Sequence, residues 1–467
     1  MLSNIAAQHG AKGEINMTQE QAASPLFSAN DLKKLILPLI AEQFLAVTVG
    51  MADTVMVSSV GEAAVSGISI VDQINTLLIQ VFAALATGGA VVASQYLGRR
   101  ERNHAVESAK QLYYVTLLLS LFIGVVCVVT NRGLLSFIYG RVEPDVMENA
   151  ATYFWLSALS YPFIALYNAG AALFRSMGNS KVSLYASLGM NVINIGGNAL
   201  LIYGLHWGVA GAAAASLLSR LAAAAMVTVL LLNPGHPIYL HELHKPTFHP
   251  GMVKSILRIG IPTGLENGMF QVGKLLVAGM ITTYGTAAIA ANAVCNNVTS
   301  MNNIPASAIG LAAVTVVGRC VGARDTVQAR RYGVRLMGLA HLSMVVVSLL
   351  VFFSSPALVG FYEMSSETTS LALGIIRIVC LSSIAFWPCS FTLPQILRAA
   401  GDAKYTMAVS MFSMWVFRVG FSVVLGTWLN WGLLGVWAAM IIDWVVRDVF
   451  FVLRFLGNRW LQKKVIE

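Results

Sequence analysis

The chain has 467 residues, of which 11% are charged and 57% are apolar, and its formal net charge is +9 at pH 7. Soluble domains carry about 25% charged residues, so this composition excludes an ordinary soluble protein and favours a chain embedded in lipid. The net charge requires no nucleic-acid partner, because a rim of Lys and Arg facing the cytoplasm produces the same excess.

Residues 1–30 are polar and are expected to form a mobile cytoplasmic tail. The first long apolar run, from Leu35, is too long for the core of a secretory signal, so we expect no such signal. Apolar runs of about 20 residues or more then follow one another, each long enough to cross a bilayer as a helix. The sequence therefore predicts an all-α polytopic membrane protein, with transmembrane helices at 35–57, 67–93, 109–130, 148–175, 181–204, 207–232, 254–283, 287–316, 331–353, 368–397, 404–426 and 431–456.

The cations indicate how these twelve helices are oriented. Most of the 30 Lys and Arg lie in the N-terminal tail, in alternate loops and after the last helix, whereas only Arg132 and Arg141 lie in the other loops. By the positive-inside rule, this is a multi-pass protein of the inner or plasma membrane with both termini in the cytoplasm. Five cations remain inside helices: Arg220, Lys274, Arg377, Arg418 and Arg447.

The second half of the chain repeats the first at an offset of 224 or 223 residues. The matches include Pro38 with Pro262, Glu42 with Glu266, Gly98 with Gly322, Arg175 with Arg398, and "WGVAG" at 207–211 with "WGLLG" at 431–435. Both six-helix halves enter the membrane the same way round, which predicts two lobes related by a pseudo-twofold axis along the membrane normal. We expect an N-lobe at 31–232, a cytoplasmic connector at 233–253, a C-lobe at 254–456 and a basic cytoplasmic tail at 457–467.

Three patterns that carry chemistry in other proteins are not expected to do so here. Gly268, Gly273 and Lys274 have the spacing of a phosphate-binding loop, but Leu275 stands where that loop needs Ser or Thr, so we expect no ATP site. The connector histidines fit no standard set of metal ligands, and a solvated linker is expected there. The cysteines show no paired spacing and are expected to be small apolar packing residues. We therefore predict no metal site and no cofactor; the residues concerned are His236, His241, His244, His249, Cys127, Cys295, Cys320, Cys380 and Cys389.

Several motifs together resemble the multidrug and toxic compound extrusion (MATE) transporters. They include Pro38 in the first helix, "ADTVMVSSVG" after it, "SQYLG" closing the second helix and "VVGRCVG" closing the eighth. They also include "LFRSMGNSK" with "ILRAAGDAK", and "GVAGAAAASLLSR". The resemblance covers about residues 33–456 and implies a twelve-helix antiporter with two six-helix lobes.

The resemblance also implies a cation or proton site in the N-lobe. The family's Asp on the first helix, Asn and Asp on the fifth and Thr on the sixth correspond to Asp53, Asn194, Asn198 and Ser216. Asn198 departs from the family's Asp, which removes one negative charge and favours a single proton on Asp53 over tight Na⁺ binding. Pro38 is expected to let the first helix bend when Asp53 changes protonation. Other branches of the family place acids near Phe270 and at Trp387, so that site does not transfer to this chain.

Apart from the resemblance, charged residues inside the helices indicate functional or paired groups, because burying a charge in a bilayer is costly. Glu42 and Asp53 are eleven residues apart, on one face of a helix and about 16 Å apart along it. Glu42 is interpreted either as facing the cavity or as lying in a wet entrance. Asp72, with Asn75, forms a polar patch on the second helix, and Asn296 holds the position equivalent to Asp72 in the second half.

The C-lobe has more buried cations than acids. Glu266 and Lys274 are too far apart on their helix to pair, so Lys274 is expected to find its partner on another helix, with Asp443 as the candidate. Arg447 is one helical turn from Asp443, and Arg418 lies on the preceding helix. Two interpretations stay open: a network that locks the C-lobe, or one that handles substrate or protons. Glu266 is expected to attract a cationic substrate.

These observations predict a secondary antiporter that exports organic, cationic and amphipathic compounds, driven by H⁺ influx, with Na⁺ as the alternative coupling ion. The expected partners are the small-molecule substrate and membrane lipid, and the chain is expected to act as a monomer. A flippase for a lipid-linked precursor is the alternative function. A membrane enzyme would need acids, bases or metal ligands clustered at one membrane face, and we find no such cluster in the sequence.

Overall fold

The computed structural model describes residues 25–140, 142–243 and 247–466, and within 51–54 it describes the backbone alone. The described chain is helical, without strands. Its first half contains α2 (Ala29–Ser58), α3 (Glu62–Gly98), α4 (Arg102–Tyr139), α5 (Pro144–Leu159), α6 (Tyr161–Ser176), α7 (Ser180–Asn198), the π-helix η1 (Ala199–Gly204) and α8 (Gly208–Leu231). Its second half contains α9 (Pro250–Ile281), the short η2 (Thr282–Tyr284), α10 (Thr286–Asn302), α11 (Ile304–Gly322), α12 (Thr326–Gly360), α13 (Ser366–Trp387), the π-helix η3 (Pro388–Thr392), α14 (Leu393–Ala399), α15 (Ala403–Ser413), the π-helices η4 (Met414–Gly420) and η5 (Ser422–Trp428), and α16 (Gly432–Leu456).

These segments form the twelve predicted spans, and several spans are interrupted near a proline. α5 and α6 together make the fourth span and meet at an angle of 46° just before Pro162. α10 and α11 make the eighth, with Pro305 in the first turn of α11, and Pro388 begins η3 in the tenth. Proline lacks the N–H that would continue the helical hydrogen bonds, so each break follows from the sequence.

Eight helices of the described chain are long and apolar enough to cross a membrane, or nine when the bent pair α5–α6 counts as one span. α7, α9 and α16 are not among them. These three helices carry Asn194, Glu266, Lys274 and Asp443, whose polar side chains reduce the apolar character of the segments that contain them. Polar residues are costly in lipid, so these helices are where a functional site is expected.

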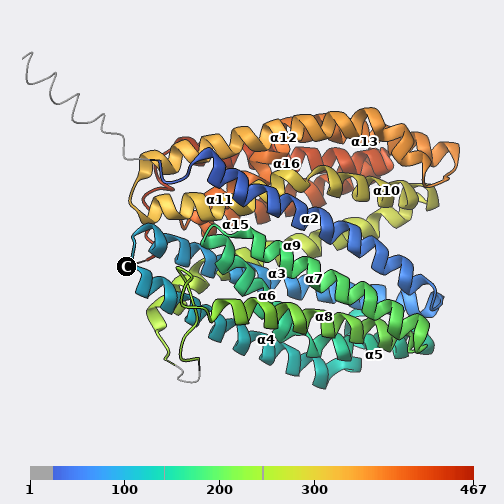
Figure 1. The fold of residues 1–467 in the computed structure, drawn as a ribbon. Helices are drawn as coiled ribbons and strands as arrows, with labels where there is room; N and C mark the ends of the chain where they lie inside the picture. The colour runs from blue at the N-terminus through green and yellow to red at the C-terminus, as the bar shows by residue number, and fades with distance from the viewer. Residues whose placement is uncertain (1–24, 141, 244–246, 467) are drawn as a thin grey trace, which may run out of the picture.

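The helices form two bundles that lie side by side in Figure 1, α3–α8 in one and α10–α16 in the other. α2 and α9 pass between them. Leu35 and Leu39 of α2 belong to the C-lobe core, whereas Val57 at its other end belongs to the N-lobe core. The lobe division at residue 232 therefore describes α3–α8 but does not describe the first half of α2, which packs against the other lobe.

α9 crosses between the lobes in the opposite direction. Ile256 and Ile259 at its start belong to the N-lobe core, and Val277 and Ile281 near its end belong to the C-lobe core. Each exchanged helix contains one internal proline, Pro38 in α2 and Pro262 in α9. Pro38 lies among the α2 residues that pack on the C-lobe core, and Pro262 lies in the part of α9 that packs on α3 of the N-lobe. A missing hydrogen bond makes bending easier at each proline.

The two lobes make their closest contact where α3 and α11 end. A Cβ atom on Gly98 would overlap the carbonyl oxygen of Arg319, and one on Gly322 would overlap that of Gln95. Gln95 donates to the Ala399 carbonyl at 2.9 Å, and Arg319 donates to the Ser176 carbonyl at 2.7 Å. Gly98 and Gly322 are equivalent in the repeat, so this glycine contact obeys the pseudo-twofold symmetry.

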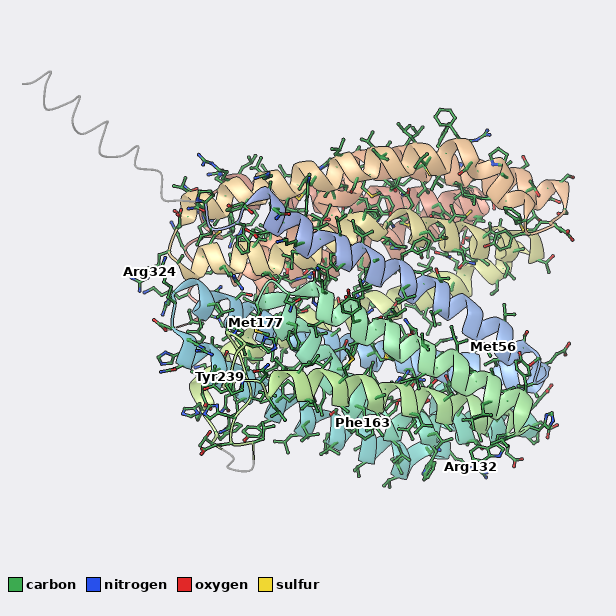
Figure 2. The ribbon with its side chains drawn as sticks, viewed as in Figure 1. Met56, Arg132, Phe163, Met177, Tyr239 and Arg324 are labelled. Carbon is green, nitrogen blue, oxygen red and sulfur yellow. The ribbon has the colours of Figure 1, made fainter. Side chains whose placement is uncertain are left out.

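The connector and the C-terminal tail lie at the same end of the bundle as Arg324, Met177 and Tyr239, opposite Met56 and Arg132 (Figure 2). The connector is docked on the N-lobe through three hydrogen bonds from Arg102 to its carbonyl groups, and its Ile238 and Leu240 are buried. α9 begins at Pro250, within the predicted connector 233–253.

The tail predicted at 457–467 is also packed rather than free. Trp460, Val465 and Ile466 are buried, and Ser255 of α9 donates to the Val465 carbonyl at 2.8 Å. Val465 and Ile466 belong to the N-lobe core although the tail follows the last C-lobe helix. The tail therefore joins the two lobes at this end. Of the predicted N-terminal tail 1–30, residues 1–24 lie outside the described chain.

Candidate functional site

The centre of the N-lobe is an uncharged polar pair between α7 and α8. Asn194 donates from its side-chain amide to the hydroxyl of Ser216 at 3.1 Å, and both residues are buried. Asn198 follows one turn later and is fully buried. The helices approach closely here, because a Cβ atom on Gly197 would lie 2.9 Å from the side chain of Ala215. Three of the four residues predicted for the coupling site are thus brought together.

Asp53 lies on α2, but its side chain is outside the described atoms. Two contacts fix how α2 lies along α7 and η1: Ser183 donates to Glu42 at 2.7 Å, and Tyr203 donates to the Met56 carbonyl at 3.2 Å. The backbone of Asp53 lies between them, one turn before Met56. This places the Asp53 backbone beside the α7 segment that carries Asn194 and Asn198.

Asp72 belongs to a second polar cluster of the N-lobe. Tyr153 and Asn75 each donate to its carboxylate at 3.3 Å, and Tyr161 donates to the Asn75 side chain at 2.8 Å. The predicted patch on the second helix therefore extends to the fourth span. Arg220, an intramembrane cation, donates to the Ser160 hydroxyl at 2.6 Å where that span bends.

The repeat is visible in two equivalent ion pairs. Glu42 lies 3.7 Å from Arg175, and Glu266 lies 2.6 Å from Arg398. Each ion pair also has a hydroxyl side chain beside it, at the equivalent position of the repeat. Ser183 donates to Glu42, while Thr406 accepts from Arg398 at 3.2 Å.

These pairs bear on two predictions. Glu42 is only 8% exposed, so it does not lie in a wet entrance. Glu266 is equally buried, and its charge is balanced by Arg398. A carboxylate whose charge is balanced attracts a cation more weakly than a free one, and the role of Glu266 towards a cationic substrate stays a prediction.

The C-lobe centre is a charged network around Asp443. This carboxylate is fully buried, lies 2.9 Å from Arg447 and 3.9 Å from Arg418, and accepts a hydrogen bond from Ser413. The one-turn spacing of Asp443 and Arg447 thus brings them into an ion pair. The predicted pairing of Asp443 with Lys274 is wrong, because two guanidinium groups already surround the carboxylate.

Phe270 connects the two guanidinium groups. Arg418 lies 5.3 Å and Arg447 5.4 Å from the centre of its ring, distances typical of cation–π contacts. Phe391 contacts Phe270 edge to face and stacks on Trp387. Phe270 and Trp387, which stand near the acid positions of other family branches, are thus parts of one aromatic layer.

Two cavities flank this network. One, of about 190 Å³, is lined by Glu266, Phe270, Arg398 and Arg447. The other, of about 180 Å³, is lined by Lys274, Arg418 and further residues of α9, α10 and α16. Among the described residues, Lys274 has no ion-pair partner.

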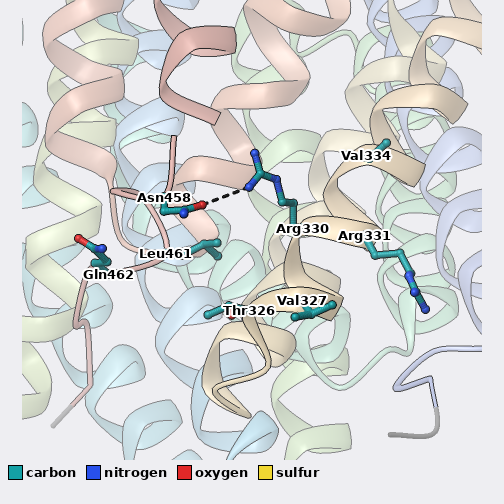
Figure 3. A pocket seen from close by; sticks show the side chains of 8 residues that line it. All are labelled: Thr326, Val327, Arg330, Arg331, Val334, Asn458, Leu461 and Gln462. Carbon is teal, nitrogen blue, oxygen red and sulfur yellow. Dashed lines mark hydrogen bonds between the residues drawn. The ribbon is translucent and has the colours of Figure 1, made fainter. Parts of the chain in front are cut away.

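No group of three or more possible metal ligands occurs in the described part of the chain. Of the connector histidines, His244 lies outside it, and His249 contacts Glu107 at 3.0 Å. A surface hollow of about 700 Å³ lies at the start of α12 beside the tail, where Arg330 donates to Asn458 (Figure 3). Its residues belong to neither lobe centre.

The sequence interpretation missed Arg175, Arg398 and Asp448 as partners of other polar residues. Asp448 accepts a hydrogen bond from Ser390 at 2.7 Å. The two arginines were recognised as repeat matches, and so were Glu42 and Glu266. Two acids that recur at an offset of 224 and two arginines that recur at 223 are a signal that the acid and the arginine of each half contact each other, and this signal was available in the sequence.

Comparisons with known proteins agree with this architecture. The MatE family model matches residues 38–200 and again residues 262–424, so its two matches follow the internal repeat. The chain is 28% identical over 442 residues to the uncharacterized transporter YisQ of Bacillus subtilis, which covers 92% of this chain and 95% of YisQ. It is 26% identical over 449 residues to the probable multidrug resistance protein NorM of Thermotoga maritima, covering 93% and 94%.

A solved structure described as the outward-facing conformation of a multidrug resistance MATE family transporter superposes with a TM-score of 0.85. The sequences are 19% identical, and the match covers 92% of this chain and 94% of the other. The twelve-helix, two-lobe fold predicted from the sequence is confirmed.

Proposed function

Because this chain belongs to the MatE family of efflux transporters and is not an enzyme, we propose that it is an antiporter that exports organic compounds in exchange for protons. The observation that carries the proposal is the N-lobe centre, where Asn194 is bonded to Ser216 beside the α2 segment that contains Asp53. An acid in a site whose other described polar groups are uncharged is suited to bind and release one proton. Without a second acid at Asn198, the proposal favours H⁺ over Na⁺.

Protonation of Asp53 would remove one negative charge from the N-lobe. A change of charge shifts a conformational equilibrium only if the two conformations stabilise that charge differently. Pro38 supports such a difference, because it lies in the part of α2 that packs on the C-lobe core, whereas Asp53 lies in the part that leads to the N-lobe core. In this proposal, α2 bends at Pro38 when Asp53 is protonated.

The glycine contact supports alternating access. It holds the lobes together at the end that the positive-inside rule places in the cytoplasm. Export requires this contact to separate, so that the space between the lobes becomes accessible from inside. The contact is built from two glycines and four hydrogen-bonding groups, which suits a contact that forms and separates. The transporter is proposed to work as a monomer in the cell membrane.

The test is efflux of a fluorescent dye in inverted membrane vesicles, with the proton gradient and the Na⁺ gradient collapsed separately. We expect collapse of the proton gradient to abolish transport. Asp53→Asn should reduce transport to the level of vesicles without the protein, because asparagine imitates the permanently protonated acid. Asp72→Asn is the matched control, since it also removes an N-lobe acid, and it should retain most of the transport.

Full transport by Asp53→Asn would remove the N-lobe coupling site from the mechanism. Transport that stops only when the Na⁺ gradient is collapsed would replace H⁺ by Na⁺ as the coupling ion.

A further inference from the structure

The C-lobe cavity beside Lys274 is lined by cations and has no acid among its lining residues. Two cationic side chains face it, Lys274 from α9 and Arg418 from η4. Val277, Asn292, Trp437 and Met440 also line the cavity.

The charge around this cavity is not balanced by the protein. Asp443 lies behind the cavity wall, and its single carboxylate is shared between Arg418 and Arg447. Asp448 lies close enough to Arg447 for their charges to interact, and Glu266 is paired with Arg398. Three acids therefore face four cations in the lobe centre, and the excess positive charge belongs to Lys274, which has no ion-pair partner among the described residues.

The polar groups of the cavity are mainly hydrogen-bond donors. The Nε of Arg418 is buried and has no hydrogen-bond acceptor among the described residues. Trp437 donates to the side-chain oxygen of Asn292 at 3.2 Å, which leaves the amide NH₂ of Asn292 as the donor end. Buried donors without acceptors are costly, and an incoming anion would satisfy them.

The repeat relates this cavity to the N-lobe coupling site. At the 224-residue offset, Val277 stands where the N-lobe has Asp53, and Met440 stands where it has Ser216. The C-lobe has one extra residue between the matches at offset 223 and those at 224. The π-helix η4, which contains Arg418, provides a place for it, because a π-helical turn holds an additional residue without breaking the helix.

We propose that this C-lobe cavity binds an anionic group, a carboxylate or a similar acid, of the organic compound that the transporter exports. Lys274 and Arg418 bind the acid, and Trp437 offers an apolar surface to the part of the compound next to it. Drug-sized ligands occupy pockets of about 300–1,000 Å³, so a cavity of about 180 Å³ holds the acidic end and not the whole compound.

This proposal rests on the proposed export function, but it replaces the cationic substrate expected from the sequence. A cationic group in this cavity would lie against two cationic side chains, Lys274 and Arg418, with no acid among the lining residues. The neighbouring cavity contains Glu266, but Arg398 and Arg447 line it as well. Neither cavity of the C-lobe therefore offers an unpaired acid for a cation among the described residues.

The test is equilibrium binding to the purified full chain, which requires neither coupling nor transport. Isothermal titration at pH 7.4 compares three probes of similar shape: 1-naphthoate, neutral 1-naphthamide and cationic 1-naphthylmethylamine. The protein is held in phosphatidylcholine nanodiscs, so that no anionic lipid competes. We expect 1-naphthoate to bind at least tenfold more tightly than either of the other probes.

Lys274→Met should weaken 1-naphthoate binding roughly tenfold, the value of one charge-assisted hydrogen bond, and Lys274→Arg should preserve it. Lys254→Met is the matched control, because Lys254 is an exposed lysine of the same helix and does not line the cavity. It should bind like the wild type. Lys274 has no ion-pair partner among the described residues, so its loss should not unfold the protein, and thermal unfolding of each variant checks this.

Equal binding by the wild type and Lys274→Met, or tighter binding of the amine than of the acid, would overturn the proposal. Displacement of 1-naphthoate by phosphatidylglycerol in the nanodisc or by inorganic phosphate would overturn the assignment to an organic substrate, since the site would then take a lipid headgroup or a free anion. Loss of transport in Asp53→Asn with normal 1-naphthoate binding would support both proposals. Normal binding with full transport in Asp53→Asn would overturn only the coupling mechanism.

Discussion

The centres of the two lobes lie at equivalent positions of the repeat and have opposite electrostatic character. In the N-lobe, Asn194 and Ser216 form an uncharged pair beside the helix that carries Asp53. In the C-lobe, Asp443 is enclosed by two arginines, and Lys274 faces an adjoining cavity. Outside these centres the halves agree closely, since the prolines, the ion pairs and the glycine contact all recur. The repeated residues maintain the shared architecture, and the lobe centres are where the two halves have diverged.

The largest expected difference between the lobes concerns Asp443 and its N-lobe equivalent Ser219. Asp443→Ala removes the fully buried acid that pairs with both Arg418 and Arg447, which should reduce the free energy of unfolding by about 3–5 kcal/mol. Ser219→Ala removes only a hydroxyl that donates to the Ser216 carbonyl, and should cost about 1 kcal/mol or less. Thermal unfolding in detergent compares the stabilities of the two variants.

Adding Arg447→Ala to Asp443→Ala should restore part of the lost stability, because one uncompensated charge is removed with the acid. If the losses of stability caused by the two substitutions instead add, the residues do not interact energetically, and the C-lobe centre is not a charge network.

The equivalent ion pairs give a smaller difference. Arg398 lies 2.6 Å from Glu266 and is 5% exposed, whereas Arg175 lies 3.7 Å from Glu42 in a looser pair. We expect Glu266→Gln to lower the free energy of unfolding by about 2–3 kcal/mol and Glu42→Gln by about 1 kcal/mol. A double-mutant cycle with Arg398→Met and Arg175→Met measures each coupling energy. The reverse ranking would show that separation and burial do not set the strength of these pairs.

Substitution of either glycine in the contact between the lobes should have the same effect. Gly98→Ala and Gly322→Ala each force a methyl group onto a backbone carbonyl, and overpacking of this kind costs about 1–3 kcal/mol. The variants should open this end of the transporter, which is measured as a longer distance between spin labels at Arg100→Cys and Arg324→Cys in a background without the native cysteines.

Gly338→Ala is the control for this experiment, because no atom lies within 4 Å of the added methyl group. Unchanged distances in both contact variants would show that the glycine contact does not hold the lobes together.

The smallest expected effect is a difference in transport rate between proline variants of α2 and of α9, the two helices that cross between the lobes. Pro38→Ala and Pro262→Ala restore a helical hydrogen-bonding group at equivalent places. If proton coupling resides in the N-lobe, Pro38→Ala should fold, insert and transport several-fold more slowly, while Pro262→Ala should change the rate less. Initial efflux rates at matched expression measure this. Equal slowing by both would indicate that bending is needed in both helices and is not tied to Asp53.

The sequence by itself determined the membrane class, the twelve spans and the internal repeat. These features depend on local apolar length and on matched positions along the chain, so they need no knowledge of which helices touch. The pairing of Asp443 with Arg447 was also predictable, because residues four apart share one face of a helix. Asn194, Asn198 and Ser216 were found through a resemblance, and the structure brings Asn194 to Ser216 across two helices.

Only the tertiary structure decided the partners of the other buried charges. Glu266 is 132 residues from Arg398 in the chain. The repeat marks both residues as recurring, but only the arrangement of α9 against α14 brings the carboxylate to the guanidinium group. The exchange of α2 and α9 between the lobes, the glycine contact and the packing of the tail also depend on how the helices are arranged in space. Lys274 shows the physical reason most clearly. Its sequence position indicates a costly buried charge, but its role follows from the fact that Arg418 and Arg447 already surround the nearest acid, which leaves Lys274 facing a cavity that an anion would neutralise.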